Sequence, residues 1–260
     1  MMDLKSSNSA YKDTPYWWEH RRPVADTTTL PEEADVVVIG SGYTGLHAAI
    51  QTARSGMHTV VIDAGQIGQG CSTRNGGQVS TSIKPSFDSL RKTFGASIAE
   101  RICREGQASL DFTAKFVSDE AIECDFSVVG RFHGAHSARQ YEQLARVADA
   151  THPVLETKAY VVPKSEQHSE LRTEFYHGGI VFPKHASINP GAYHSGLVHL
   201  AQQSGATLIP NCAATALTEE GKGHEVQTVQ GRIRARHVIV ATNGYSGKCT
   251  GAGGGGGEFG

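Results

Sequence analysis

A short apolar run that ends in a glycine turn constrains the fold more than any other feature of this sequence. Residues 35–39, Asp-Val-Val-Val-Ile, lead into Gly40-Ser-Gly42-Tyr-Thr-Gly45, and a helix-like stretch over 44–55 precedes a second apolar run over 59–63. This order predicts a strand, a crossover helix and a second, parallel strand. Because the runs are continuously apolar instead of alternating, we expect the parallel sheet to be central, buried and covered by helices on both faces.

The glycines are spaced as in a dinucleotide-binding turn. Gly40 permits the tight turn, Gly42 lets the backbone approach a pyrophosphate, and Gly45 lets the helix pack closely on the strand, while the helix N-terminus attracts phosphate charge. Asp63 lies 21 positions after Gly42, where an acidic residue accepts a hydrogen bond from a ribose hydroxyl. The pattern fits NAD and FAD equally, since both carry an ADP half. A glycine turn in an unrelated α/β protein is the alternative.

The rest of the chain predicts further helices and strands around this unit. Residues 65–85 are rich in Gly, Ser, Asn and Gln and are too long for a simple connection, which favours a functional loop. Residues 1–33 are expected to form an arm whose cluster Tyr16-Trp17-Trp18 docks on a core without regular structure. The patterns predict helices at 87–118, 137–149 and 190–204, and strands at 124–133 (bent at Gly130), 178–182, 206–209, 213–218, 224–230 and 235–241.

The segment that follows Asp63 separates the two cofactors. Residues 67–78, Ile-Gly-Gln-Gly-Cys-Ser-Thr-Arg-Asn-Gly-Gly-Gln, together with the unit before them, resemble the glycine/D-amino-acid oxidase (DAO) family of FAD-dependent oxidoreductases. Within the family the segment is most similar to the gamma-glutamylputrescine oxidoreductase-like branch. Cys71 stands where that pattern has alanine and Thr73 where it has glycine, so a positive φ at Thr73 would strain the backbone.

Three later segments carry the same resemblance. Residues 178–190 resemble the return from the substrate domain into a flavin-domain helix, residues 211–217 the strand that contacts adenine, and residues 238–245 the strand end beside the cofactor. The resemblance implies FAD, with a hydroxyl, a guanidinium and clustered backbone N–H groups around its pyrophosphate and ring. The candidate cofactor-binding residues are Gly40, Gly42, Tyr43, Thr44, Gly45, Asp63, Ala64, Ser72, Arg74, Asn75, Gly76, Gly77, Ala214, Thr242 and Asn243.

The resemblance also implies a fold class and a domain plan. We expect an α/β chain with a Rossmann-type FAD-binding domain, a parallel sheet with helices, over 34–120 and 190–245. Part of an α+β substrate domain is expected over 121–189. Seven of the 30 glycines fall within the last ten residues, and residues 246–260 do not resemble the family. We therefore expect a C-terminally truncated member of the family.

The composition excludes several other classes of protein. With 24 Lys and Arg residues against 26 Asp and Glu, the formal net charge is −2, which lacks the basic surplus of a nucleic-acid-binding protein. No apolar run approaches the ~20 residues of a membrane span, and residues 1–15 lack the apolar segment of a secretory signal, so we expect a cytoplasmic protein. The 13 histidines, His194 and His199 among them, lack metal-ligand spacing; we predict surface or hydrogen-bonded roles and no metal.

Together these features predict an FAD-dependent oxidoreductase that acts on the CH–NH bond of a small amine or amino acid. The expected reaction passes a hydride to the flavin and leaves an imine that is then hydrolysed. The sequence assigns no catalytic acid or base. Two alternatives stay open: an inactive truncated fragment with only weak binding of the ADP moiety, and an NAD-dependent Rossmann enzyme.

Overall fold

A computed structural model describes residues 12, 14–19, 28–81, 83–149 and 158–245. The chain divides into two compact units: unit 1 combines residues 1–76 with 190–260, and unit 2 comprises residues 77–189. Unit 2 ends at residue 189, where we also expected a domain boundary. Unit 2 begins after Gly76, so residues 77–120, which we expected in the FAD-binding domain, group with residues 121–189.

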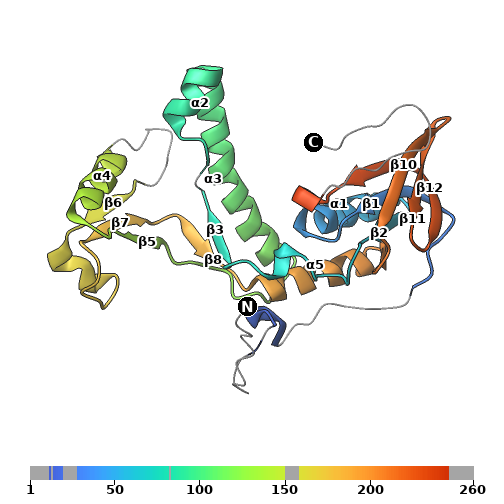
Figure 1. The fold of residues 1–260 in the computed structure, drawn as a ribbon, viewed down its shortest axis with the longest axis horizontal. Helices are drawn as coiled ribbons and strands as arrows, with labels where there is room; N and C mark the ends of the chain where they lie inside the picture. Colours follow the sequence, from blue (N-terminus) through green and yellow to red (C-terminus); the bar gives the residue numbers. More distant parts are fainter. Residues whose placement is uncertain (1–11, 13, 20–27, 82, 150–157, 246–260) are drawn as a thin grey trace, which may run out of the picture. The chain divides into compact units, whose positions relative to one another are not determined.

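Unit 1 is built on one six-stranded sheet, in the order β10-β11-β12-β1-β2-β9. The neighbours β12, β1, β2 and β9 run parallel, whereas β10, β11 and β12 form an antiparallel meander. In Figure 1 the blue β1 lies beside the red β12, so segments from early and late in the sequence share this sheet. The strands are β1 (Glu33–Ile39), β2 (Thr59–Ile62), β9 (Thr207–Ile209), β10 (Ala214–Glu220), β11 (Gly223–Thr228) and β12 (Gly231–Val240).

The two faces of this sheet are covered differently. Helices α1 (Tyr43–Arg54) and α5 (Pro190–Gln203) pack on each other, and they contact β1, β2 and β9. On the other face, Val37 and Val60 share a core with Val226 and Ile233 of the meander. The expectation of helices on both faces is therefore wrong for this second face. A continuous apolar strand indicates that both of its sides are buried, but it does not indicate what buries them.

Unit 2 holds two small sheets, in the orders β3-β8-β4 and β5-β7-β6, and its paired strands are all antiparallel. Helices α2 and α3 pack on each other, and α3 contacts β3, which explains why residues 77–120 belong to this unit. The elements are β3 (Gln78–Ser80), α2 (Phe87–Phe94), α3 (Ala96–Asp119), β4 (Ser127–Val128), β5 (Arg131–Gly134), α4 (Ala138–Asp149), β6 (Tyr160–Val162), β7 (Gly179–Phe182) and β8 (His185–Ser187).

Glycines in the left-handed region divide two of the predicted elements of unit 2. Gly95, with φ +83°, separates α2 from α3, so the predicted helix over 87–118 is two helices. Gly130, with φ +73°, separates β4 from β5, which confirms the predicted bend in that strand. Ser86 caps α2, because its hydroxyl oxygen accepts a hydrogen bond from the Ser89 amide.

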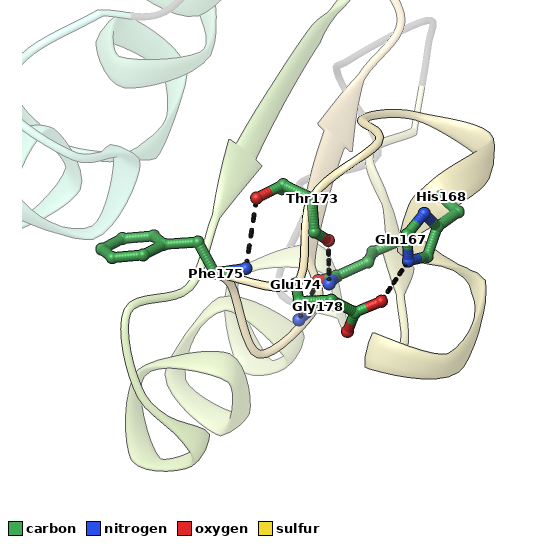
Figure 2. A network of polar contacts seen from close by, with 6 residues as sticks. All are labelled: Gln167, His168, Thr173, Glu174, Phe175 and Gly178. Carbon is green, nitrogen blue, oxygen red and sulfur yellow. Dashed lines mark hydrogen bonds and ion pairs between the residues drawn. The ribbon is translucent and has the colours of Figure 1, made fainter.

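A buried amide organises one end of unit 2. Figure 2 shows Gln167, on the 3-10 helix η3 (Lys164–Ser169), between Thr173 and Gly178. Its Nε2 donates to the Thr173 carbonyl oxygen at 2.6 Å, and its Oε1 accepts from the Gly178 amide at 3.1 Å. Gln167 is fully buried, whereas the adjacent His168–Glu174 ion pair is exposed. The amide thus satisfies backbone groups that the loop over 163–178 leaves unpaired.

Within the part of the chain that the structure describes, the helices are too short or too polar to cross a lipid bilayer.

Candidate functional site

The glycine turn lies between β1 and α1, as predicted, and its backbone is closely packed. Gly40 has φ +108°, and a Cβ there would lie 2.6 Å from the Ala241 carbonyl oxygen. A Cβ at Gly45 would overlap the Gly40 carbonyl oxygen and press on Val38. Glycine at these two positions therefore lets strand end, turn and helix meet without space for side chains.

The N-terminus of α1 is open at Gly42. Gly42 is the N-cap residue, its backbone is extended, and no side chain caps the helix there. A Cβ built on Gly42 would lie 3.1 Å from Ser72 Oγ. The Tyr43 amide donates to Ser72 Oγ at 3.3 Å, and Thr44 is exposed on the first turn. Backbone N–H groups, the helix dipole and a hydroxyl thus converge at one point, a combination that suits a phosphate.

Asp63 follows β2 and is braced beside the glycine turn. Its Oδ2 accepts hydrogen bonds from the Ser41 amide at 2.8 Å and from Ser41 Oγ at 2.6 Å, and its Oδ1 accepts from the Gly65 amide at 3.0 Å. An ionised carboxylate offers about four acceptor positions, so these three bonds orient it and leave room for a further donor. The half-exposed Asp63 is therefore positioned to bind a hydroxyl group.

A buried histidine on α5 supports the same turn. His194 is 3% exposed, and its Nε2 lies 2.7 Å from the Ser41 carbonyl oxygen. Because a carbonyl can only accept, Nε2 carries the proton. Burial lowers the pKa of His194, although the Ser41 carbonyl and the Asp63 charge oppose this effect. The sequence predicts a surface or hydrogen-bonded role for His194. Its hydrogen bond to Ser41 spans 153 positions, so no pattern in the sequence around His194 indicates that contact.

The remaining predicted residues of unit 1 gather around these groups. The Cys212 amide donates to the Asp63 carbonyl at 2.7 Å and the Asn211 amide to the Gly65 carbonyl at 2.8 Å, which brings the start of β10, at Ala214, towards the exposed Ala64. The Ala241 amide donates to the Ile39 carbonyl, so Thr242 and Asn243 follow directly beside the turn. Asn243 Nδ2 lies 3.8 Å from Cys71 Sγ.

The loop over 71–76 brings further polar groups to unit 1. Thr73 is the last residue of the 3-10 helix η2 (Cys71–Thr73). Threonine adopts this right-handed conformation without the backbone strain that a positive φ would cause. Arg74, Asn75 and Gly76 follow and are exposed. Gly77 is the first residue of unit 2, where its carbonyl accepts from the Ile188 amide. The other fourteen candidate residues all belong to unit 1.

Two findings limit other kinds of site. Among the described residues, no group of three or more His, Cys, Asp and Glu side chains is placed to hold a metal ion. A cavity of about 230 Å³ in unit 1 lies against α5 and β9, with Ile67, Val198, Gln202 and Leu208 in its wall. None of the candidate cofactor-binding residues lines that cavity.

A parallel β1-α1-β2 unit with this turn and this carboxylate defines a dinucleotide-binding fold of the Rossmann type. The chain belongs to the DAO family of FAD-dependent oxidoreductases, because the family model, described as "FAD dependent oxidoreductase", matches residues 35–258. The matched range extends past Tyr245, where we expected the resemblance to end.

Relatives and solved structures agree with this assignment. The chain is 31% identical to the "Probable oxidoreductase OrdL" of Rhizobium meliloti (strain 1021), over 89% of this chain and 55% of that protein. It is 27% identical to the gamma-glutamylputrescine oxidoreductase of Escherichia coli (strain K12), over 85% of this chain and 52% of that protein. Glycine oxidase from Geobacillus kaustophilus shares the fold, with a TM-score of 0.69 at 18% identity, over 81% of this chain and 55% of that chain. The chain spans about half the length of the curated relatives it matches.

Proposed function

We propose that this chain binds FAD through unit 1. The observation that carries the proposal is the convergence at the N-terminus of α1, where the open Gly42, the Tyr43 amide and Ser72 Oγ meet beside the braced Asp63. In this proposal the ADP half lies along the glycine turn with its ribose at Asp63. The flavin half extends towards the loop over 71–76.

The residues present fit such a ligand. Among the described atoms, Ser72 Oγ alone comes within 4 Å of a Cβ built on Gly42, so a pyrophosphate can approach the backbone there. The donors at this point are backbone N–H groups and the Ser72 hydroxyl, which match phosphate oxygens. Asp63 supplies acceptors, which match ribose hydroxyls. These donors and this acceptor support the proposal that the phosphates and the ribose of FAD bind here.

We further propose that the substrate is a small amine or amino acid, oxidised at its CH–NH bond. The names of the relatives, a gamma-glutamylputrescine oxidoreductase and a glycine oxidase, support this class. Bound FAD would supply a hydride acceptor for the substrate's α-carbon, and the imine left after the nitrogen loses a proton would be hydrolysed by water. The residues described above bind and orient; we assign none of them as a catalytic acid or base.

The test is a binding titration of the purified 260-residue chain with FAD, ADP and NAD, followed by flavin and tryptophan fluorescence. We expect FAD to bind more tightly than ADP, and both to bind more tightly than NAD. Asp63→Asn should weaken FAD and ADP alike by about tenfold, since a hydrogen bond to a charged acceptor is lost. Asp88→Asn, an exposed carboxylate of unit 2, is the matched control.

Three results would contradict the proposal. Tight binding of NAD without FAD would favour the nicotinamide-dependent alternative. Binding of ADP alone would favour the fragment with a partial site. If FAD binds but no amine or amino acid from a panel bleaches its visible absorbance under anaerobic conditions, the proposed substrate class fails for this chain while cofactor binding stands.

A further inference from the structure

The loop that the proposed function assigns to the flavin half is exposed at its end. Residues 74–76 are exposed, and a Cβ built on Gly70 or on Gly76 would meet no atom within 4 Å. Within the loop, Asn75 Nδ2 donates to the Ser72 carbonyl at 3.0 Å and to the Cys71 carbonyl at 3.3 Å. Ordering such a segment costs roughly 1–2 kcal/mol of backbone entropy per residue, so an external restraint has a large effect on it.

Two consecutive tryptophans from the N-terminal arm supply that restraint. Trp17 Nε1 donates to the Asn75 carbonyl oxygen at 2.9 Å, and Trp18 Nε1 donates to Thr73 Oγ1 at 2.8 Å. The Arg74 guanidinium carbon lies 4.5 Å from the centre of the Trp18 ring, a cation–π contact. Three successive residues of the loop are therefore each held by one of two successive residues of the arm.

The arm is itself structured at this point. Residues Tyr16–Glu19 form the 3-10 helix η1, which contacts α5, and the Trp18 amide donates to the Pro15 carbonyl at 3.0 Å. This confirms the predicted docking and shows that the expectation of no regular structure is wrong. The indole N–H groups thus extend from a 3-10 helix that packs on unit 1.

Thr73 completes the contact. Its side chain is 4% exposed, and its Oγ1 accepts from Trp18 while donating to the Gly68 carbonyl at 2.6 Å. A glycine at this position would offer no such acceptor. The Trp18 indole and the Thr73 hydroxyl are therefore a matched donor and acceptor in this chain.

We propose that Trp17 and Trp18 are positioning residues that hold the loop over 71–76 ready for the flavin half of the cofactor. The inference rests on the proposed binding of FAD. Its consequence is a selective effect: weakening the restraint reduces affinity for FAD, whose flavin half uses the loop, and spares ADP, which uses the glycine turn and Asp63. Pre-ordering a binding loop raises affinity by removing the ordering cost from the binding step.

The experiment compares dissociation constants for FAD and for ADP in the full chain and in variants of the pair. Trp18→Leu, which removes both the donor and the ring, should raise the Kd for FAD about tenfold and leave that for ADP within about twofold. Trp18→Phe removes the donor of the indole hydrogen bond, whereas Thr73→Val removes its acceptor together with the hydrogen bond to the Gly68 carbonyl. Trp18→Phe should raise the Kd for FAD about threefold and Thr73→Val at least as much, and the double variant should bind FAD no more weakly than Thr73→Val alone. Tyr16→Phe, on the same 3-10 helix, is the control and should match the wild type.

A second measurement needs no cofactor. Trypsin should cleave after Arg74 several-fold faster in cofactor-free Trp18→Leu than in the wild type, because the loop is released. If Trp18→Leu does not fold, the conservative variants Trp18→Phe and Thr73→Val test the inference by the same two measurements, the Kd for FAD and the rate of trypsin cleavage.

The outcomes separate the two proposals. FAD affinity equal in the wild type and all variants, with unchanged cleavage, would overturn the inference and leave the proposed function intact. Equal losses for FAD and ADP would also overturn it, because they would indicate a general structural role. A wild-type chain that binds neither ligand would overturn the proposed function and, with it, this inference.

Discussion

The two units of this chain are stabilised in different ways. Among the described residues, the largest fully buried side chains of unit 1 are apolar and lie on its sheet and on the helices against it, whereas those of unit 2 are Ile180 and the amide Gln167. Unit 2 also carries exposed apolar side chains on its helices, such as Phe94 and Phe112. Unit 1 therefore buries large apolar side chains completely, an effect that is non-directional, whereas unit 2 adds to its apolar burial a buried amide whose hydrogen bonds are directional.

The largest expected effect tests the apolar side of this comparison. Ile62, at the end of β2, is fully buried in the core beneath the meander. Ile62→Ala should lower the free energy of unfolding by about 2–5 kcal/mol, because it removes buried methyl groups and leaves a cavity. Urea unfolding followed by circular dichroism measures the loss.

The matched change in unit 2 is Leu171→Ala, at a residue that is 46% exposed. Its expected cost is within about 0.5 kcal/mol. Equal losses at the two positions would break the comparison.

The next effect tests the polar side of the comparison. Gln167→Leu preserves much of the side-chain volume but leaves the Gly178 amide and the Thr173 carbonyl without their partner. We expect a loss of about 2–3 kcal/mol in the local stability of unit 2, since each unsatisfied buried group costs about 1–3 kcal/mol. Hydrogen exchange of the amides around Gly178 measures it.

His168→Asn serves as the control for this change. It removes only the exposed ion pair to Glu174, which is expected to contribute about 0–1 kcal/mol. Full protection of the Gly178 amide in Gln167→Leu would show that the buried amide does not hold this loop.

The smallest effect concerns pH and the turn in unit 1. Burial keeps the pKa of His194 below its usual value of 6.5, so the unfolded chain takes up a proton there before the folded chain does. The stabilisation is complete above about pH 6.5. It is lost as the pH falls, by up to about 1.4 kcal/mol per pH unit until the folded-state pKa is reached.

The variant His194→Gln keeps an N–H donor near the Ser41 carbonyl and does not titrate, so its unfolding free energy should depend less on pH between about 6.5 and 5. His199→Gln, at an exposed position of the same helix, should follow the wild type. Parallel pH profiles for all three proteins would contradict the assigned role of His194.

The part of the site that is contiguous in sequence could be predicted. The strand, turn, helix and strand expected at 35–39, 40–45, 44–55 and 59–63 are observed at Glu33–Ile39, Tyr43–Arg54 and Thr59–Ile62, with the glycines between them. Such elements give a signal because their apolar periodicity and their glycines lie within one short window. The resemblance implies that Ser72 binds the cofactor, but it does not predict the hydrogen bond from the Tyr43 amide to Ser72 Oγ.

The distant contacts could not be predicted. The indole of Trp18 meets Thr73 across 55 positions, and the imidazole of His194 meets the Ser41 carbonyl across 153. Strands β3, β6 and β8 have three residues each, too few for a periodic pattern. The grouping of residues 77–120 with residues 121–189 likewise depends on the packing of α3 against β3, which leaves no mark in the local sequence.

Binding of FAD at the glycine turn is tested most directly by comparing its affinity for the wild-type chain and for Gly42→Val. Gly42 has φ −72°, and a Cβ there would meet only Ser72 Oγ, at 3.1 Å, in the described structure, so we expect the variant to keep its fold and its circular dichroism. We expect the wild type to bind FAD and Gly42→Val to bind it about a hundredfold more weakly, because the side chain occupies the approach of the pyrophosphate. Equal affinities in a folded variant would contradict binding of FAD at the glycine turn.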